Sequence, residues 1–309
     1  MDISDISLGI VMLLQISTGA SVNVFLLLFY THMVFSSHKL SSSDLILTHL
    51  ALANTIILLT YGIPETISAW GWRNFLNTIG CKIVLYIYRV ARGLSICTTC
   101  LLSNFQAITI SPSTTLWAGV KVKLPKCIIP SFVFFWVLNL LININALVYA
   151  SGPQNSTTIQ ITYDLKYSSI TILSAEATLI NTVMLSGRDL LFVGLMSTAS
   201  GYMVFVLHRH HRQVRHLHGP GSFSRAMPEV RAAKRIIALV TLYVLLYGRH
   251  PVMFSILLNR KEKSPLLVNI HTVMVFGFPV FSPFLVIHSD RRMRTFWKRE
   301  STVSIVDPS

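Results

Sequence analysis

Residues 81–110, CKIVLYIYRVARGLSICTTCLLSNFQAITI, form a mainly apolar run with two arginines, Arg89 and Arg92, near its middle. A helix needs about 20 residues to cross the ~30 Å hydrocarbon core of a bilayer, so a run of this length is typical of a membrane span. An arginine near the bilayer centre costs about 2.5 to 3.5 kcal/mol on insertion scales. We therefore expect each arginine to have either a partner inside the protein or a role in binding.

The rest of the chain has the same apolar character. Hydrophobic residues make up 52% of the sequence, charged residues make up 12%, and the mean hydropathy is +0.59. A soluble domain carries roughly 25% charged residues, so this composition indicates a membrane protein. Seven runs are long enough to span, at about 8–34, 44–64, 81–110, 127–150, 183–208, 230–258 and 266–288. We predict an all-α seven-transmembrane helix bundle in one domain, 1–298, followed by a short cytoplasmic tail, 299–309.

Basic residues indicate the orientation of this bundle. If the N-terminus is outside, most of the 26 lysines and arginines lie in cytoplasmic segments, as the positive-inside rule requires. The smaller outer set is Arg73, Lys82, Lys166, Arg188, Arg260, Lys261 and Lys263. The sequon at Asn155 also falls in an outer loop, where glycosylation can occur. We expect a multi-pass plasma membrane protein with a cytoplasmic C-terminus, in which Met293, Phe296 and Trp297 line one face of a short amphipathic helix after the seventh span.

Several functions are excluded by what the sequence lacks. The net charge of +14 does not indicate nucleic-acid binding, because no soluble basic domain carries it. A histidine-rich run, 208–218, is interleaved with arginines that repel a cation, so we expect no metal site there. Neither a glycine-rich phosphate loop nor a nucleophile elbow is present. The chain is therefore predicted to have no enzymatic activity and no cofactor.

Some residues fit the skeleton of rhodopsin-like G-protein-coupled receptors, among them Asn23, Cys81 and Trp136. Others depart from it. Asn54 stands where the sodium-binding carboxylate of that class would be, and Phe105-Gln106-Ala107 occupies the place of its acidic-Arg-Tyr triplet. An ordinary rhodopsin-like receptor is therefore not indicated.

Four stretches, 89–113, 194–220, 228–240 and 278–290, closely resemble the vomeronasal type 1 receptor family, and the resemblance runs from about residue 5 to 298. It implies a chemosensory receptor that detects small pheromone-like molecules and activates an inhibitory-class heterotrimeric G protein. A bitter-taste-type receptor is the alternative within the same class. A membrane transporter or channel is the alternative from another class, and the arginines inside the spans are its only support.

We expect the ligand to bind in the outer half of the bundle, between spans three, five, six and seven. Two interpretations of Arg89 and Arg92 remain open. They pair inside the bundle with helix carbonyls or with the nearest acids, Asp189 and Glu176, or they contact a polar or anionic ligand group. Arg249 lies at a similar depth but is not part of the family signature, which favours a role in ligand selectivity. The candidate ligand-binding residues are Arg89, Arg92, Tyr86, Tyr247, Arg249, Asp189 and Glu176.

The cytoplasmic side of the predicted bundle is basic. The resemblance implies that this surface contacts the G protein, whereas binding of anionic lipids is the alternative. The candidate residues are Gln106, Lys121, Lys123, Arg209, Arg212, Arg231, Lys234 and Arg235.

The resemblance also draws attention to a missing cysteine. The family usually has one in the second outer loop, able to pair with the cysteine that opens span three, which here is Cys81. Ser168 stands at that place in this chain. We therefore expect no outer disulfide.

Overall fold

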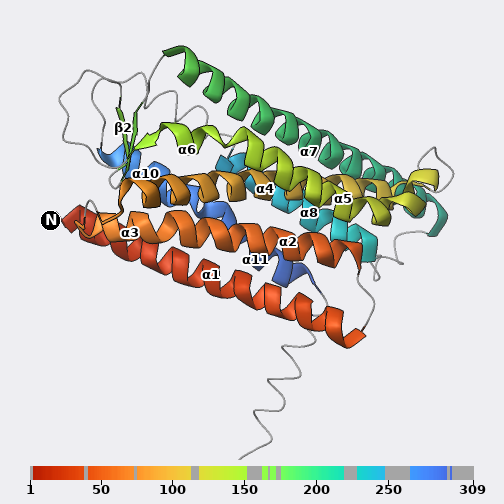
Figure 1. Ribbon diagram of the computed structural model, residues 1–309. Helices are drawn as coiled ribbons and strands as arrows, with labels where there is room; N and C mark the ends of the chain where they lie inside the picture. The colour runs from red at the N-terminus through yellow and green to blue at the C-terminus, as the bar shows by residue number, and fades with distance from the viewer. Residues whose placement is uncertain are drawn as a thin grey trace, which may run out of the picture.

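The computed structural model describes residues 3–37, 41–72, 75–112, 118–151, 162–165, 168–171, 175–218, 228–247, 265–290 and 293. Long helices lie side by side in one bundle (Figure 1). The helices are α1 (Ile3–Ser37), α2 (Ser42–Ile57), the π-helical turn η1 (Leu58–Gly62), α3 (Ile63–Ala69), α4 (Thr78–Ile110), α5 (Ala118–Ile142), α6 (Asn145–Tyr149), α7 (Ala175–His218), α8 (Pro228–Tyr247), α10 (Pro265–Val275) and α11 (Gly277–Ser289). Three short strands, β1 (Ala150–Ser151), β2 (Thr162–Leu165) and β3 (Ser168–Thr171), lie at the end of the bundle that holds the N-terminus.

Six described stretches are long and apolar enough to cross a membrane, and they match six of the seven predicted spans. They are Ile6–Met33, Ser42–Ala69, Thr78–Ile110, Gly119–Leu147, Val183–Arg209 and Asn269–His288. The remaining predicted span, 230–258, corresponds to α8 as far as Tyr247. Its first turns carry acidic and basic residues, which lower the hydropathy of the described part. Asn155, Arg249, the tail at 299–309 and the predicted amphipathic helix, apart from the buried Met293, lie outside the described residues.

Prolines explain two irregularities in the helices. Pro64 cannot donate to the carbonyl of Thr60, and the widened turn of η1 directly precedes it. In the seventh span, α10 ends at Val275, four residues before Pro279, and α11 begins after Phe276. Pro283 leaves the carbonyl of Pro279 without its helical donor.

A buried asparagine supplies the missing donor. The Nδ2 of Asn23 on α1 donates to the freed carbonyl of Pro279 at 2.9 Å and to Gly19 at 2.7 Å. Nearby, Asn54 on α2 donates to Ser282 on α11 at 3.0 Å and accepts from Ser95 on α4 at 3.2 Å. These side chains therefore tie four helices together through hydrogen bonds that are out of reach of water.

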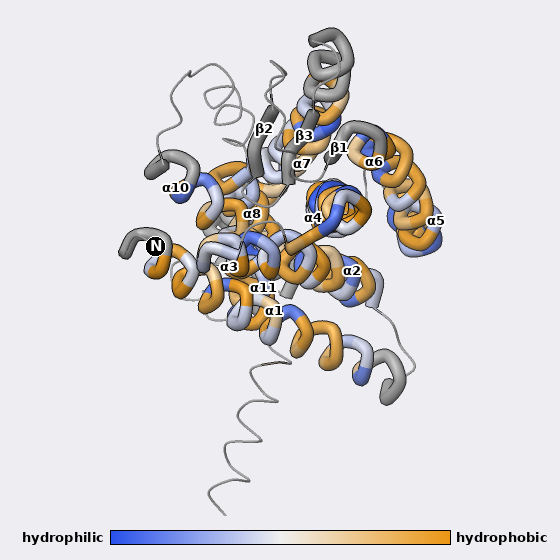
Figure 2. Tube along the Cα trace, turned by 60° about the vertical axis from the view of Figure 1, so that its left-hand side comes forward, coloured by the Kyte–Doolittle hydropathy of each residue, from blue (hydrophilic) through white to orange (hydrophobic). Residues whose placement is uncertain are grey.

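Helix α4 occupies the centre of the bundle. In the view nearly along its axis it is surrounded by α2, α5, α7 and α8 (Figure 2), and it contacts each of them. Its membrane-crossing part is 67% buried, against 28% for that of α1 and 22% for that of α5. Small and polar residues such as Gly93, Ser95 and Thr99 suit this position, because they let neighbouring helices approach closely.

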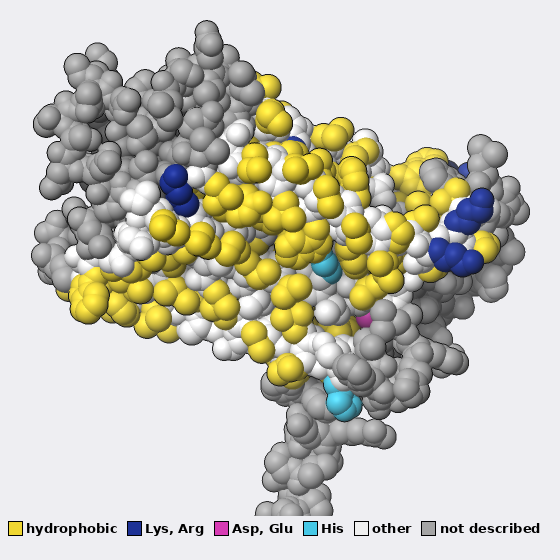
Figure 3. Space-filling model, viewed as in Figure 1, with side chains coloured by type: hydrophobic (Ala, Val, Ile, Leu, Met, Phe, Trp, Pro, Cys, Tyr) yellow, Lys and Arg dark blue, Asp and Glu magenta, His cyan; other side chains and the backbone are white. Residues whose placement is uncertain are grey.

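The outer helices expose apolar side chains around this core. Leu28 on α1, Ile129 on α5, Leu190 on α7 and Leu245 on α8 are each about two thirds exposed. On the face shown in Figure 3, hydrophobic side chains cover the middle of the molecule, and lysine or arginine side chains lie towards its ends. A surface of this kind fits the hydrocarbon of a bilayer.

The strands form a small antiparallel sheet in the order β1-β3-β2, which the sequence analysis did not predict. Ser168 lies in β3, where it pairs with Leu165 of β2. The thiol of Cys81 lies 3.9 Å from the carbonyl oxygen of Leu76. All four cysteines of the chain are among the described residues, and none forms a disulfide.

Candidate functional site

An ion pair joins α4 to α7 in the middle of the bundle. The Nη2 of Arg92 lies 2.5 Å from Oδ2 of Asp189, and both side chains are largely buried, at 15% and 13% exposure. Taking a guanidinium into the bilayer region is costly, and a carboxylate within hydrogen-bond distance offsets much of that cost. The ion pair between Arg92 and Asp189 that one interpretation expects is thus present.

Asp189 has a second basic partner, Arg188, which is only 7% exposed. Its Nε and Nη2 both donate to Oδ1 of Asp189, at 3.0 and 2.7 Å. Its Nη1 donates to Oδ1 of Asn139 on α5 at 2.9 Å. Two guanidinium groups thus share one carboxylate, and this cluster carries one positive charge in excess.

Aromatic residues of α8 and α11 border the Arg92 side of the cluster. The guanidinium carbon of Arg92 lies 5.8 Å from the ring centre of Tyr247, which is a cation–π distance. Tyr247 stacks on Tyr243, and both rings meet Phe278 edge-on. Among the described residues, Nε of Arg92 and the hydroxyl of Tyr247 are buried and have no hydrogen-bond partner. Each can therefore still donate a hydrogen bond.

The remaining ligand candidates lie in different places. Arg89 is half-buried on α4, one turn before Arg92. Tyr86 faces α5, where its hydroxyl donates to the carbonyl of Leu140 at 3.0 Å, whereas Arg92 faces α7 and α8. Glu176 belongs to the first turn of α7, but its side chain is outside the described part of the structure, as is the whole of Arg249.

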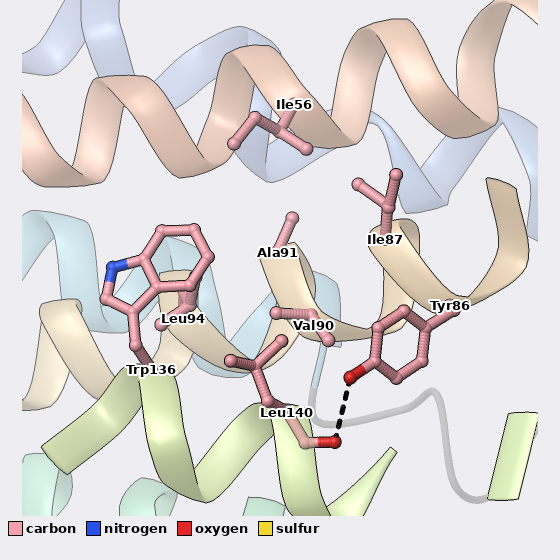
Figure 4. A pocket seen from close by; sticks show the side chains of 8 residues that line it. All are labelled: Ile56, Tyr86, Ile87, Val90, Ala91, Leu94, Trp136 and Leu140. Atoms are coloured by element: carbon pink, nitrogen blue, oxygen red, sulfur yellow. Dashed lines mark hydrogen bonds between the residues drawn. The ribbon is translucent and has the colours of Figure 1, made fainter. Parts of the chain in front are cut away.

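Tyr86 lines a small groove between α2, α4 and α5 (Figure 4). The groove has a volume of about 80 Å³, and its lining is almost wholly apolar, with Ile56, Val90 and Leu140 among its walls. The indole of Trp136, at one end, donates to Nε2 of His49 at 3.1 Å. The hydroxyl of Tyr86 and the indole of Trp136 thus already donate within the protein, so neither donor is left for a ligand in the groove.

The expected G-protein surface lies at the end of the bundle opposite the N-terminus and the strands. Lys123, Arg209, Arg212 and Lys234 are exposed there, and Arg235 is half-buried. Arg231 lies on α8 with its side chain outside the described residues. Gln106 is buried at 4% exposure, and the half-buried Lys121 donates to the carbonyl of Ser111 at 2.5 Å.

Sequence reasoning missed Arg188 and Asn139. The prediction that Arg188 belongs to the outer basic set is wrong, because its guanidinium folds into the bundle between α5 and α7. Arg188 lies within the predicted span 183–208 and next to an acid, which could have signalled a buried charge. No comparable signal marks Asn139, since one polar residue in a span is common.

Comparison with known proteins gives a consistent picture. The model of the family described as "Vomeronasal organ pheromone receptor family" matches residues 6–299. "Vomeronasal type-1 receptor 3" of Homo sapiens is 39% identical over 291 residues, which cover 94% of this chain and 93% of that protein. "Olfactory receptor class A-like protein 1" of Danio rerio is 36% identical over 287 residues, covering 93% of this chain and 90% of that protein.

Among solved structures, the crystal structure of squid rhodopsin is similar, with a TM-score of 0.76. The alignment covers 99% of this chain and 87% of that chain at 15% sequence identity, so the likeness concerns the fold alone. The predicted seven-helix membrane bundle is thereby confirmed.

Proposed function

Because this chain belongs to the vomeronasal organ pheromone receptor family, we propose that it is a receptor for small pheromone-like organic molecules that activates an inhibitory-class heterotrimeric G protein. Membership of this family, together with the rhodopsin-like fold, makes the chain a multi-pass membrane receptor and not an enzyme. The family match over residues 6–299 also favours a receptor over the transporter or channel that the buried arginines left open.

The ligand site that we propose lies between α4, α7 and α8, around Arg92, Asp189 and Tyr247. The observation that carries it is the excess of guanidinium over carboxylate there, combined with two buried donors that have no partner among the described residues. A polar or anionic group of a ligand satisfies both requirements, while the aromatic rings around Tyr247 suit an apolar ligand body.

The distribution of charges supports the orientation that we propose. With the N-terminal end outside, the exposed Lys123, Arg209, Arg212 and Lys234 face the cytoplasm, as the positive-inside rule requires. Binding at the proposed site then shifts an existing equilibrium between closed and open arrangements of the cytoplasmic end. Burial of Gln106 supports assigning the described arrangement to the closed state.

The test is a G-protein activation assay in cells that express the chain, with a panel of neutral and anionic odorants and steroids. Arg92→Gln is compared at matched surface expression with Thr198→Ala, an exposed position on α7 whose hydroxyl donates to Leu195 of its own helix. We expect an active compound whose potency falls at least tenfold in Arg92→Gln and is unchanged in Thr198→Ala. Equal potency on all three receptors contradicts the proposed site, and ion current or uptake without G-protein activation contradicts the proposed function.

A further inference from the structure

Arg188 makes more hydrogen bonds than Arg92 in the polar cluster, and it donates them to Asp189 and Asn139. We propose that Arg188 is a positioning residue for the ligand site: it holds the carboxylate of Asp189 against Arg92 and keeps it partnered when Arg92 turns to a ligand. The inference rests on the proposed function, because the site that Arg188 positions is the proposed ligand site.

The guanidinium of Arg188 is fixed at all three nitrogens. Nε and Nη2 both donate to one carboxylate oxygen of Asp189, Oδ1, and Nη1 donates to Oδ1 of Asn139. The other carboxylate oxygen, Oδ2, is thereby presented to Arg92 at 2.5 Å. A planar fork of this kind sets the direction of the carboxylate, which the single ammonium of a lysine cannot do.

Asn139 is held just as firmly. It is fully buried, and its Nδ2 donates to the carbonyl of Phe135 at 2.8 Å and approaches the sulfur of Cys97 at 3.6 Å. With its amide nitrogen engaged in this way, the amide oxygen is directed towards Arg188. The side chain of Asn139 thus fixes the end of Arg188 that lies farther from Asp189.

Gly93, next to Arg92 on α4, makes this arrangement possible. A Cβ atom at that position would lie 1.8 Å from Oδ1 of Asn139 and 2.7 Å from Nη1 of Arg188. The hydrogen bond between α5 and α7 therefore passes over a bare stretch of the α4 backbone, and any side chain there would displace it. Three helices contribute to holding one carboxylate in place.

The arrangement solves a problem that a simple ion pair would create. If a ligand draws Arg92 away from a carboxylate that has no other partner, a buried charge is left uncompensated, which is strongly unfavourable. Because Arg188 keeps its two bonds to Oδ1 of Asp189, Arg92 can change partner without isolating Asp189. Arg188 thus lowers the cost of ligand binding without touching the ligand.

The test uses the full-length receptor, purified in detergent without ligand, and compares melting temperatures in two backgrounds. In the wild type, Arg188→Gln removes a partner of Asp189, and we expect the melting temperature to fall by about 5 °C. In an Asp189→Asn background Arg188 keeps its bond to Asn139 but loses its ionic partner and is repelled by Arg92, so the same substitution is expected to lower the melting temperature by less than half as much. Arg188→Lys should restore less than half of the loss, and Arg212→Gln, an exposed arginine on the same helix, should change nothing.

Equal destabilisation by Arg188→Gln in both backgrounds, or full stability of Arg188→Lys, overturns the inference, since either indicates a role in packing alone. If Arg188→Gln does not fold, Asn139→Ala provides a second test in which neither arginine is changed: it should destabilise the wild type by more than the Asp189→Asn variant, and equal losses overturn the inference. These measurements require no ligand and no G protein. A receptor that activates no G protein contradicts the proposed function, whereas the difference between the two backgrounds still decides the role of Arg188.

Discussion

Substituting Tyr202 by phenylalanine removes one hydroxyl from the contact between α4 and α7 at the cytoplasmic end. Ser111, the residue that caps α4, donates its hydroxyl proton to the carbonyl of Ala107 at 2.9 Å. Its oxygen lies 3.0 Å from the hydroxyl of Tyr202 and therefore accepts a hydrogen bond from it. Ser111 is only 2% exposed, and Lys121 of α5 bonds to its carbonyl, so three helices meet at this point.

The magnitude follows from this single bond. A hydrogen bond between neutral groups contributes about 1 kcal/mol net. If the bond exists only in the closed arrangement, its loss changes the ratio of open to closed receptor by about fivefold, since ~1.4 kcal/mol corresponds to a factor of ten. Gln106 stands where the arginine of the acidic-Arg-Tyr triplet would be. An ion pair made by that arginine therefore does not add to the stability of this contact.

The assay is nucleotide exchange on a purified inhibitory-class heterotrimer, with the receptor in lipid nanodiscs and no ligand added. We expect Tyr202→Phe to raise the basal exchange rate about fivefold over wild type. Thr198→Ala, which removes an exposed α7 hydroxyl that donates to Leu195 of the same helix, serves as the matched control and should leave the rate unchanged. An unchanged or lower rate for a Tyr202→Phe receptor of normal thermal stability refutes the assignment of this bond to the closed state.

Three further outcomes are expected. Trp136→Phe leaves Nε2 of His49 without its donor and should destabilise the receptor by about 1 to 2 kcal/mol, seen as a lower melting temperature in detergent. Asn54→Ala removes two buried hydrogen bonds that join α2 to α4 and α11, and should lower the melting temperature by ~5 °C or more; a loss no larger than that for Thr198→Ala argues against this tie. Lys123→Glu lies on the exposed cytoplasmic surface and should keep the melting temperature while reducing ligand-stimulated nucleotide exchange severalfold; unaltered exchange would assign this lysine to lipid contact instead.

The sequence predicts the bundle well because each span is a long apolar run, which can be recognised from its hydrophobicity and its length. The ends and irregularities are less predictable. The turn of η1 depends on how the helix accommodates Pro64, and the small sheet around Ser168 depends on pairing between strands of four residues. Short polar strands of this kind have no pattern that distinguishes them from a loop.

The candidate site could be predicted only in part. The sequence identified Arg92 and named Asp189 as one of two nearby acids, since buried charges need partners. It could not determine that Arg188 folds inwards, because this depends on the rotation of α7 and on the space above Gly93. Tyr86 and Arg92 are six residues apart on one helix, but they contact different neighbours. Tyr86 bonds to α5 and Arg92 bonds to α7, so the two side chains do not line one site.

Ligand-dependent nucleotide exchange on the inhibitory-class heterotrimer, measured with wild type and Arg92→Gln in nanodiscs, tests the central claim most directly. The panel contains neutral and anionic pheromone-like compounds, and a stimulatory-class heterotrimer serves as the comparison. The account predicts that at least one compound accelerates exchange on the inhibitory-class protein alone, and that Arg92→Gln requires at least a tenfold higher concentration of it. Acceleration that is independent of Arg92, or that occurs on the stimulatory-class protein instead, would contradict the account.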